Sequence, residues 1–404
     1  MEYGLIGEHL GHSFSKEIHE MLGGYQYELK EIQPCDVESF MRRREFKAIN
    51  VTIPYKQTVI AFLDEIDEKA KAIGAVNTIV NNNGRLIGYN SDYDGILHLL
   101  KRNGINAEGM NVLLLGTGGT SHTAEAVFDD LGAKRITKVS RTKKEMAISY
   151  KDALALKDTD LIFNCTPCGM FPANDGCPIS IESFDNLKAV FDAIYNPLKT
   201  RLVLQGMTRG IIAEGGLYML VAQAAVACEK FIGKRINQSE IEEVFNYLYR
   251  KKRNIVLIGM PGSGKTTLGK LLGKENFIDS DFELSKRIGS IDSFIINNGE
   301  HLFRNEESAV IREIAKLSGK VIATGGGAVL RSENIENLKQ NGIVVYLKRD
   351  LDKLQIGNNR PLSSDYESLC KRFEERKDIY MKSADIVVEN NGSIEDCLKE
   401  LMKL

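Results

Sequence analysis

The sequence predicts an α/β protein in which a two-lobed half is followed by a smaller phosphate-binding half. Short apolar runs alternate with helical patterns along the whole chain, which is typical of α/β folds. A glycine-rich turn at Gly116–Gly119 follows one apolar run, and a second at Gly259–Thr266 follows another. At 404 residues the chain exceeds one compact core. We expect domains at residues 1–96, 97–250 and 254–404.

The composition excludes several classes of partner. Lys and Arg number 53 and Asp and Glu 55, so no net field draws the chain to nucleic acid or to an anionic membrane. No apolar run reaches the length of a membrane span, and the start Met1–Gly4 lacks the pattern of a signal peptide. We therefore expect a cytoplasmic protein that acts on small molecules. The sequence does not set its oligomeric state.

The cysteines do not predict a disulfide framework, because the 7 thiols form an odd and scattered set. Cys165 and Cys168 have the spacing of a metal-binding or redox pair. No second pair or histidine partner stands at zinc-site spacing, so idle thiols are the preferred interpretation.

The first lobe is predicted from apolar runs that alternate with helical patterns. The expected strands are Tyr3–Ile6, Ala48–Ile53 and Thr78–Val80, and the expected helices are Ser15–Leu22 and Thr58–Ile73. Alternation of this kind predicts a sheet with helices packed on it.

The second lobe begins with the order strand, glycine turn, helix, strand, which predicts a βαβ unit. The strands are Val112–Leu115 and Arg135–Val139, and a helix of small residues runs to Leu131 between them. The turn offers Gly116, Gly118 and Gly119 to a dinucleotide phosphate, although a glycine turn can also be only a tight loop. Later strands are expected at Leu161–Phe163 and Ala189–Asp192, and helices at Leu217–Ile232 and Gln238–Tyr249, with the basic run Arg250–Arg253 as a solvated linker.

The end of the second strand of this unit indicates which dinucleotide binds. NAD sites place an acidic residue there for the ribose hydroxyls. Here the strand is followed by Ser140, Arg141 and Thr142, and then by Lys143 and Lys144. Hydroxyls and cations suit a 2′-phosphate, so the sequence favours NADP over NAD. The alternative is that the two lysines are solvated charges at a helix start.

The smaller half opens with a phosphate-binding loop. The apolar run Ile255–Ile258 leads into the pattern G-x-x-x-x-G-K-T. Its glycines allow backbone N–H groups to point at phosphate oxygens, the lysine adds a charge, and the threonine hydroxyl can reach Mg²⁺. The sequence therefore predicts ATP and Mg²⁺ as ligands of Gly259, Gly262, Gly264, Lys265, Thr266 and Thr267.

Charged and glycine-rich segments downstream complete a predicted active site. Asp279 and Asp281 stand two apart at the end of an expected strand and should point the same way, one toward Mg²⁺ and one toward an acceptor hydroxyl. Further segments suit substrate contacts, a close backbone approach and a lid: Arg304 with Glu307, Thr324–Gly327, Arg360–Leu362, and Arg376 four residues before Tyr380.

Residues 254–404 resemble shikimate kinase, because these spaced motifs agree with that family. The resemblance implies that Arg304, Gly326 and Arg376 bind shikimate, its carboxylate held by the two arginines. Asp281 would accept the proton of the reacting hydroxyl and Asp279 would anchor Mg²⁺. Lys265 and Arg360 would stabilise charge on the transferring phosphoryl group. The lid segment Gln355–Asn359 departs from the family, being a residue short and lacking an upstream arginine.

The first 250 residues resemble shikimate dehydrogenase. The strings that carry the resemblance are Gly11–Ser15, Asn50–Lys56, Gly74–Thr78, Gly88–Asp92, Asn164–Met170, Asp192–Pro197 and Gly215–Gln223. The resemblance implies a substrate lobe and a Rossmann lobe. It assigns the substrate to Ser13, Ser15, Thr52, Asn77, Tyr195 and Gln223, and catalysis to Lys56 and Asp92. Two departures, His122 and Ser91, concern the cofactor and local packing.

Ordinary alternatives stand beside each assignment. Lys56 and Asp92 could form a surface ion pair, and Ser13 and Ser15 could cap the helix that follows them. Together the two resemblances imply a fusion that reduces 3-dehydroshikimate with NADPH and phosphorylates shikimate with ATP and Mg²⁺, in aromatic precursor synthesis. The rival hypotheses are a quinate-type dehydrogenase joined to another small-molecule kinase, and a nucleotide-sensing regulator without turnover.

Overall fold

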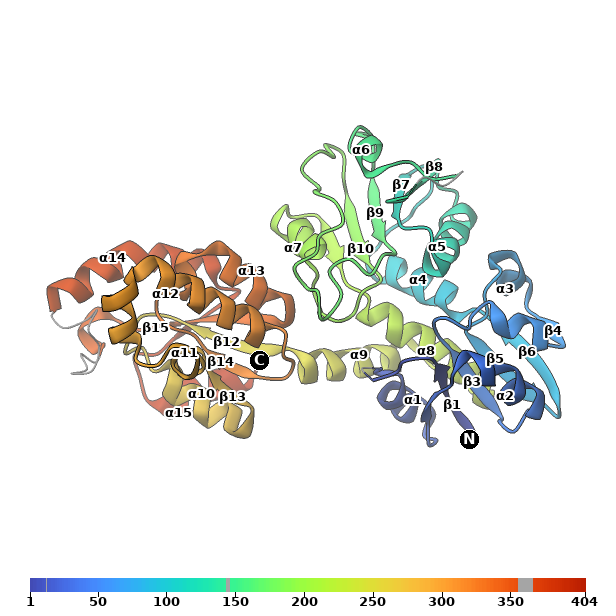
Figure 1. The fold of residues 1–404 in the computed structure, drawn as a ribbon, viewed down its shortest axis with the longest axis horizontal. Coiled ribbons are helices and arrows are strands. Elements are labelled where there is room, and N and C mark those ends of the chain that lie inside the picture. Colours follow the sequence, from blue (N-terminus) through green and yellow to red (C-terminus); the bar gives the residue numbers. More distant parts are fainter. Residues whose placement is uncertain (12, 143–145, 355–365) are drawn as a thin grey trace. The chain divides into compact units, whose positions relative to one another are not determined.

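The structure is a computed structural model that describes residues 1–11, 13–142, 146–354 and 366–404 (Figure 1). Its contacts divide the chain into two compact units. The first holds Met1–Met170, Gly176–Tyr195 and Gln205–Leu248, and the second holds Phe171–Asp175, Asn196–Leu204 and Tyr249–Leu404.

The first lobe of the first unit is built on a six-stranded sheet of order β2-β1-β3-β5-β6-β4. Strands β1, β2 and β3 are parallel, whereas β5 runs antiparallel to both β3 and β6. The elements are β1 Tyr3–Gly7, α1 Ser15–Gly23, β2 Glu28–Glu31, η1 Pro34–Asp36, α2 Val37–Arg43, β3 Ala48–Val51, η2 Thr58–Phe62, β4 Glu65–Ile66, α3 Glu68–Ile73, β5 Thr78–Asn82, β6 Arg85–Tyr89 and α4 Ser91–Arg102.

The single helix expected over Thr58–Ile73 is wrong. The segment forms η2, the short strand β4 and α3 instead. Asp67 breaks the helical pattern because its side chain accepts the N–H of Lys69 and caps α3. β4 is extended because it pairs in parallel with β6. Local periodicity was overridden by a cap and by strand pairing, which are interactions outside the periodic pattern.

The second lobe is a five-stranded parallel sheet of order β11-β10-β9-β7-β8, with α5 and α7 on opposite faces (Figure 1). This agrees with the predicted Rossmann lobe. The elements are β7 Asn111–Leu115, α5 Gly119–Asp130, β8 Arg135–Val139, α6 Tyr150–Ala153, β9 Leu161–Asn164, β10 Ala189–Asp192, α7 Arg201–Thr208, β11 Ile212–Glu214, α8 Leu217–Ile232 and α9 Gln238–Lys252.

The sequence predicted that the basic run Arg250–Arg253 is a solvated linker, which is wrong for most of it. Its first three residues form the last turn of α9, and β12 begins at Asn254. Cations are favourable at this position because the helix dipole is negative at its carboxyl end.

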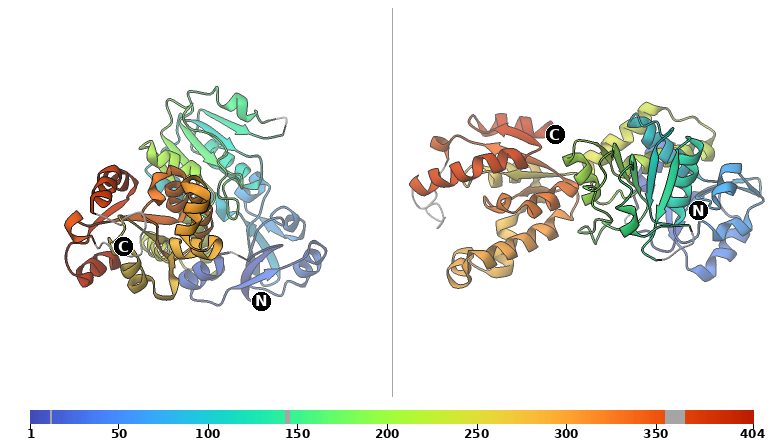
Figure 2. Two further views of the ribbon diagram at one scale, coloured as in Figure 1. Left: turned by 60° about the vertical axis from the view of Figure 1, so that its left-hand side comes forward. Right: turned by 90° about the horizontal axis from the view of Figure 1, so that it is seen from above.

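The second unit contains a parallel sheet of order β13-β14-β12-β15-β16. Helices α12, α13 and α14 lie on one face and α10 and α15 on the other, and the turned views show the sheet between helices again (Figures 1 and 2). The elements are β12 Asn254–Ile258, α10 Lys265–Gly273, η3 Lys274–Asn276, β13 Phe277–Asp279, α11 Ser280–Ile288, α12 Ile291–Ala315, β14 Val321–Ala323, η4 Ala328–Leu330, α13 Ser332–Asn341, β15 Gly342–Lys348, η5 Leu351–Lys353, α14 Tyr366–Ser383, β16 Ile386–Glu389 and α15 Ile394–Met402.

The packing of strand β12 explains why Ile255–Ile258 is a continuous apolar run. Val256 and Ile258 belong to the core under α11 to α14, whereas Leu257 belongs to the core under α10 and α15. Successive side chains of a strand point to opposite faces, so a central strand covered on both sides must be apolar throughout. The strand is thereby fixed in the middle of the sheet, with its carboxyl end leading into the phosphate loop.

Among the described residues, no helix combines the length and the apolar character required to cross a membrane.

Candidate active sites

The carboxyl edge of the second sheet carries a pocket of about 530 Å³, a size typical of small-molecule sites. The phosphate loop follows β12, Asp279 ends β13, Thr324 follows β14, Arg349 follows β15 and Asn390 follows β16, and all of them line this pocket. The carboxyl ends of parallel strands meet at one edge, where open α/β sheets bind ligands.

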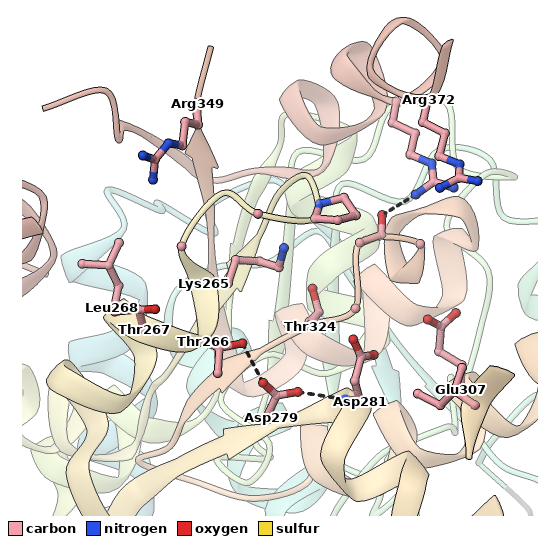
Figure 3. A pocket seen from close by; sticks show the side chains of 18 of the residues that line it. Lys265, Thr266, Thr267, Leu268, Asp279, Asp281, Glu307, Thr324, Arg349 and Arg372 are labelled. Carbon is pink, nitrogen blue, oxygen red and sulfur yellow. Dashed lines mark hydrogen bonds between the residues drawn. The ribbon is translucent and has the colours of Figure 1, made fainter. Parts of the chain in front are cut away.

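The phosphate loop is held in shape by its own lysine. Gly259, Gly262 and Gly264 have backbone φ angles of 147°, 83° and 94°. Residues other than glycine rarely adopt such angles. Lys265 is buried, and its Nζ donates to the carbonyl oxygens of Gly259 and Met260 at 2.8 and 2.9 Å. The lysine lies where its charge faces the concave side of the loop (Figure 3).

Thr266 and Asp279 form the pair of oxygen groups expected of a Mg²⁺ site. The Thr266 hydroxyl donates to Asp279 Oδ2 at 2.8 Å, and Asp279 Oδ1 accepts the N–H of Asp281 at 3.0 Å (Figure 3). Hydroxyl and carboxylate oxygens are ligands that Mg²⁺ prefers. The donor set therefore fits the cation, and Thr267 lines the same pocket beside them.

Asp281 is placed by a helix rather than by a strand. The sequence had suggested two carboxylates projecting side by side from a strand end, which is wrong. β13 ends at Asp279, which caps α11, and Asp281 lies in the first turn of that helix. Both carboxylates still line the pocket, because the cap turns the chain at this edge.

Arg304 brings a buried positive charge to the pocket. Its guanidinium donates to Glu307 at 2.8 Å and to Glu300 at 3.0 Å, and Glu307 is only 3% exposed. Burial disfavours the charged form, but the two carboxylates outweigh it and raise the pKa of Arg304. The arginine is thus charged at any physiological pH.

The glycine run after β14 passes close to the charged side chains of Asp281 and Arg304. Arg376 donates to the carbonyl oxygen of Gly326 at 3.2 Å, and the Tyr380 hydroxyl donates to the same oxygen at 2.5 Å. A side chain at Gly325 would meet Asp281, and one at Gly327 would meet Arg304. The run therefore needs glycine so that the backbone can pass close to both charged groups.

The lining residues that were not selected from the sequence include Arg372, Arg349 and Asn390. Arg372 lies one turn before Arg376 on α14, and Arg349 lies toward the phosphate loop (Figure 3). Asn390 also lies at this loop, because its Nδ2 donates to the carbonyl oxygen of Ser263 at 2.7 Å. Position alone could have found the last two, because each is the first residue after a parallel strand. Arg360 lies outside the described residues, and so does the lid segment around it.

The first unit contains the predicted pair of Lys56 and Asp92. Lys56 Nζ donates to Asp92 Oδ2 at 2.5 Å, with the two side chains 24% and 9% exposed. Asp92 lies in the first turn of α4, and Lys56 follows β3. A pair this enclosed is not an ordinary surface ion pair.

Asn77 is hydrogen-bonded to the backbone near Thr52 and near Asp92. The carbonyl oxygen of Asn77 accepts the N–H of Val51, which precedes Thr52. The side chain of Asn77 accepts the N–H of Ser91, which precedes Asp92. Asn77 therefore connects the backbone next to Thr52 with the backbone next to Asp92.

Gln223 on α8 packs against Gly95, one turn after Asp92 on α4. Its Oε1 is buried and has no hydrogen-bond partner in the described part of the chain. An acceptor without a partner is costly unless a ligand supplies a donor. The residue is suited to bind a substrate hydroxyl.

Ser13 and Ser15 stand at the start of α1. Ser13 Oγ accepts the N–H of Ser15 at 3.2 Å, so Ser13 also supports the helix start. Phe14 between them packs on the ring of Tyr195, with centroids 5.3 Å apart. The structure therefore places Tyr195 against Phe14, the residue between the two serines.

The dinucleotide turn has the geometry that phosphate approach requires. Gly116 has a φ of 107°, α5 begins at Gly119 with Gly118 as its cap, and a side chain at Gly118 or Gly119 would meet nothing within 4 Å. A helix amino end next to open backbone fits a pyrophosphate. Ser140, Arg141 and Thr142 follow β8, and Arg141 and Thr142 are exposed. This set of hydroxyls and a cation fits a 2′-phosphate.

Comparison with known families assigns each half. The family model for shikimate kinase matches residues 261–404, and the model for the shikimate dehydrogenase substrate binding domain matches residues 5–79. Shikimate dehydrogenase (NADP(+)) of Clostridium perfringens strain 13 is 35% identical over 264 residues, which cover 61% of this chain and 97% of the relative. The enzyme of Clostridium beijerinckii is 37% identical, covering 56% and 90%.

Solved structures agree with these sequence matches. A chorismate mutase/shikimate 5-dehydrogenase fusion protein from Clostridium acetobutylicum superposes with a TM-score of 0.59 at 35% identity, covering 62% of this chain and 97% of the other. The shikimate 5-dehydrogenase of Thermus thermophilus, solved with NADP(H) and shikimate, gives a TM-score of 0.56 at 28% identity, covering 61% and 99%. The chain belongs to the shikimate dehydrogenase family and carries a shikimate kinase domain after it.

Proposed function

We propose that this chain performs two consecutive reactions on one cyclohexene acid. Its first half reduces the ketone of 3-dehydroshikimate with NADPH, and its second half transfers the γ-phosphoryl group of ATP to the new 3-hydroxyl of shikimate. The observation that carries the proposal is that one polypeptide holds both an enclosed Lys56–Asp92 pair and a phosphate-loop pocket with Asp281 and Arg304.

In the reduction, Lys56 acts at the ketone oxygen. NADPH, when bound, supplies the hydride that forms the new C–H bond. The Lys56 ammonium stabilises the developing alkoxide and supplies its proton, so that the ketone becomes a hydroxyl. Asp92 holds the ammonium in place through the 2.5 Å contact.

Substrate position in this site is set by residues of both lobes. Ser13, Ser15 and Tyr195 bind the carboxylate, and the support for this assignment is that Phe14, which lies between the two serines, packs on the ring of Tyr195. Thr52, Asn77 and Gln223 bind ring hydroxyls, and the unpaired Oε1 of Gln223 supports this assignment. Gly116, Gly118 and Gly119 would hold the pyrophosphate of the cofactor, and Ser140, Arg141 and Thr142 would bind its 2′-phosphate.

In the phosphorylation, Asp281 accepts the proton of the attacking hydroxyl. Arg304 and Arg376 bind the carboxylate and set the distance of the ring from the phosphate loop. Lys265 stabilises charge on the transferring group, and Arg360 is assigned to the same task. Mg²⁺, when bound by Thr266 and Asp279, neutralises phosphate charge. Phosphoryl transfer needs mainly position and charge stabilisation, which this set supplies.

The partners that we propose are these small molecules. Balanced charge supports the absence of a nucleic-acid partner, and we expect the chain to act in the cytoplasm.

The test is a coupled assay with purified protein, 3-dehydroshikimate, NADPH, ATP and Mg²⁺. We expect loss of NADPH absorbance and formation of a phosphorylated acid from the same substrate. Faster reaction on quinate than on shikimate in the reverse redox assay would favour another substrate. Nucleotide binding without either product would overturn the proposal.

A further inference from the structure

A chain of buried polar side chains runs behind Asn77 in the first unit. The Tyr27 hydroxyl donates to Asn50 Oδ1 at 2.7 Å, and Asn50 Nδ2 donates to Thr78 Oγ1 at 3.1 Å. Thr78 Oγ1 in turn donates to Asn77 Oδ1 at 3.0 Å, and it lies 3.1 Å from the hydroxyl of Ser91. Thr78 is 0% exposed, so water does not compete for its contacts with Asn77 and Ser91.

Backbone groups at both ends fix the direction of this chain. The N–H of Ser91 can only donate, and it lies 2.8 Å from Asn77 Oδ1, so an oxygen must occupy that position. At the other end Asn50 Nδ2 lies 3.2 Å from the carbonyl oxygen of Asn77, which can only accept. Burial raises the pKa of the Tyr27 phenol, so Tyr27 remains a donor. The orientation of both amides is therefore set by chemistry.

Asn77 Oδ1 is saturated by this arrangement. It accepts from the N–H of Ser91, from Thr78 Oγ1, and from Ser91 Oγ at 3.2 Å. Rotation of the amide would turn its NH₂ group toward the N–H of Ser91, which can only donate, and would leave that buried N–H without an acceptor. Asn77 Nδ2 makes no hydrogen bond within the ranges that the structure describes, and it remains available to a ligand.

We propose that Thr78 and Ser91 are positioning residues that lock the amide of Asn77 with Nδ2 toward the substrate. The inference rests on the proposed reduction of a cyclic hydroxy acid. Asn77 then presents donors only, so the ring oxygen that it binds must act as an acceptor. Because Ser91 is the first residue of α4, the same contacts also hold the start of that helix.

The test compares Thr78→Val, which keeps the shape but loses the hydroxyl, with Thr78→Ser, which keeps the hydroxyl. We expect Thr78→Val to raise KM for 3-dehydroshikimate about five- to tenfold, the loss of one buried hydrogen bond, with kcat within about twofold. Thr78→Ser should stay within about twofold of the wild type in both. The affinity for NADPH should be unchanged, which reports a folded Rossmann lobe.

A double-mutant cycle with Asn77→Ala separates positioning from packing. If Thr78 acts through Asn77, Thr78→Val should change KM less than about twofold in the Asn77→Ala background. Equal effects in both backgrounds would overturn the proposal, and so would equal defects in Thr78→Val and Thr78→Ser.

Ser91→Ala provides a second route if Thr78→Val does not fold. It removes one donor but keeps the backbone N–H, so we expect a KM rise of about two- to threefold that vanishes with Asn77→Ala. The same rise in both backgrounds would contradict the proposal. A wild-type enzyme that does not reduce 3-dehydroshikimate would refute the proposed function. An active enzyme in which the effects of the Thr78 or Ser91 variants are independent of Asn77 would refute only this inference.

Discussion

At the scale of single residues, Arg372 adds a cation to the substrate end of the kinase pocket. It lies half-buried on α14, one turn from Arg376, and lines the same pocket as Arg304. Part of the charge of Arg304 is compensated by Glu307 and Glu300. A further guanidinium therefore strengthens the attraction for an anionic substrate.

We expect Arg372→Ala to raise KM for shikimate in the kinase reaction about three- to tenfold, since a partly screened charge is lost. The effect should shrink when KM is measured at high salt. Lys371→Ala is the matched control, because Lys371 is the exposed neighbour that does not line the pocket. An equal change in both variants would show that only the net charge of the helix matters.

His19 makes the stability of the first unit sensitive to acid. It is 2% exposed, stacks on Tyr27, and is hydrogen-bonded to Tyr25 and Cys228. Burial lowers the pKa of His19 to about 3, against 6.5 for the free group. Below pH 6.5 the unfolded chain takes up a proton that the folded chain does not, so stability falls as the pH falls from 6.5 toward 3.

We expect the wild type to lose about 1.4 kcal/mol of unfolding free energy between pH 7.5 and 5.5 that His19→Gln does not lose. Pulse proteolysis in urea, scored on the fragment of the first unit, measures this difference without requiring two-state unfolding of the whole chain. Parallel pH profiles of the two proteins would rule out His19 as the source.

At the scale of elements, the glycine run after β14 sets how close the backbone at Gly325 lies to the proposed base Asp281. The N–H of Gly325 donates to Ser280 Oγ at 2.9 Å, which ties the run to α11 and its Asp281. A side chain at Gly325 would overlap Asp281 Oδ1 and lie 3.2 Å from Glu307 Oε1. The proposed base therefore keeps its position only while residue 325 is glycine.

We expect Gly325→Ala to lower kcat of the kinase about a hundredfold, the usual cost of a misplaced catalytic group. ATP affinity should change little, because the phosphate loop is formed by residues 259–266, a different segment of the chain. Dehydrogenase turnover of the same preparation is the internal control. A kcat equal to that of the wild type in this variant would contradict the role of Asp281 as the base.

The structure also shows how far local patterns reach at this scale. Strands β8 and β10 and helix α8 have the bounds that the sequence predicted, and β10 and α8 are largely buried. Thr58–Ile73 and the strand end at Asp281 were wrong, since a capping aspartate in each case starts a helix inside the expected element. Side-chain caps compete with periodicity over a few residues, and apolar spacing does not record them.

At the scale of the whole molecule, two sets of catalytic groups predict separable activities. Lys56→Ala should lower the redox rate about 10²- to 10⁴-fold and leave phosphorylation of added shikimate within about twofold. Asp281→Ala should do the reverse. Separate assays of hydride transfer and phosphoryl transfer on each variant check this, and equal damage to both reactions by either change would contradict independent sites.

The sequence by itself determined the two chemistries of this protein. The loop Gly259–Thr266, the turn Gly116–Gly119 and the absence of an acid after β8 are local features, and short segments dictate them through backbone freedom and charge. The motifs around Lys56, Asp92, Asp281 and Arg304 carried the family resemblance in the same way.

Only the tertiary structure decided which groups meet. It joined His19 to Cys228 and Arg372 to the pocket of Arg304, and it placed Tyr27, Asn50, Thr78 and Ser91 in one line behind Asn77. These contacts depend on strand order and helix packing between segments far apart in the chain. Such pairings leave no periodic trace in the sequence, because their energy arises only when the sheets and helices have assembled.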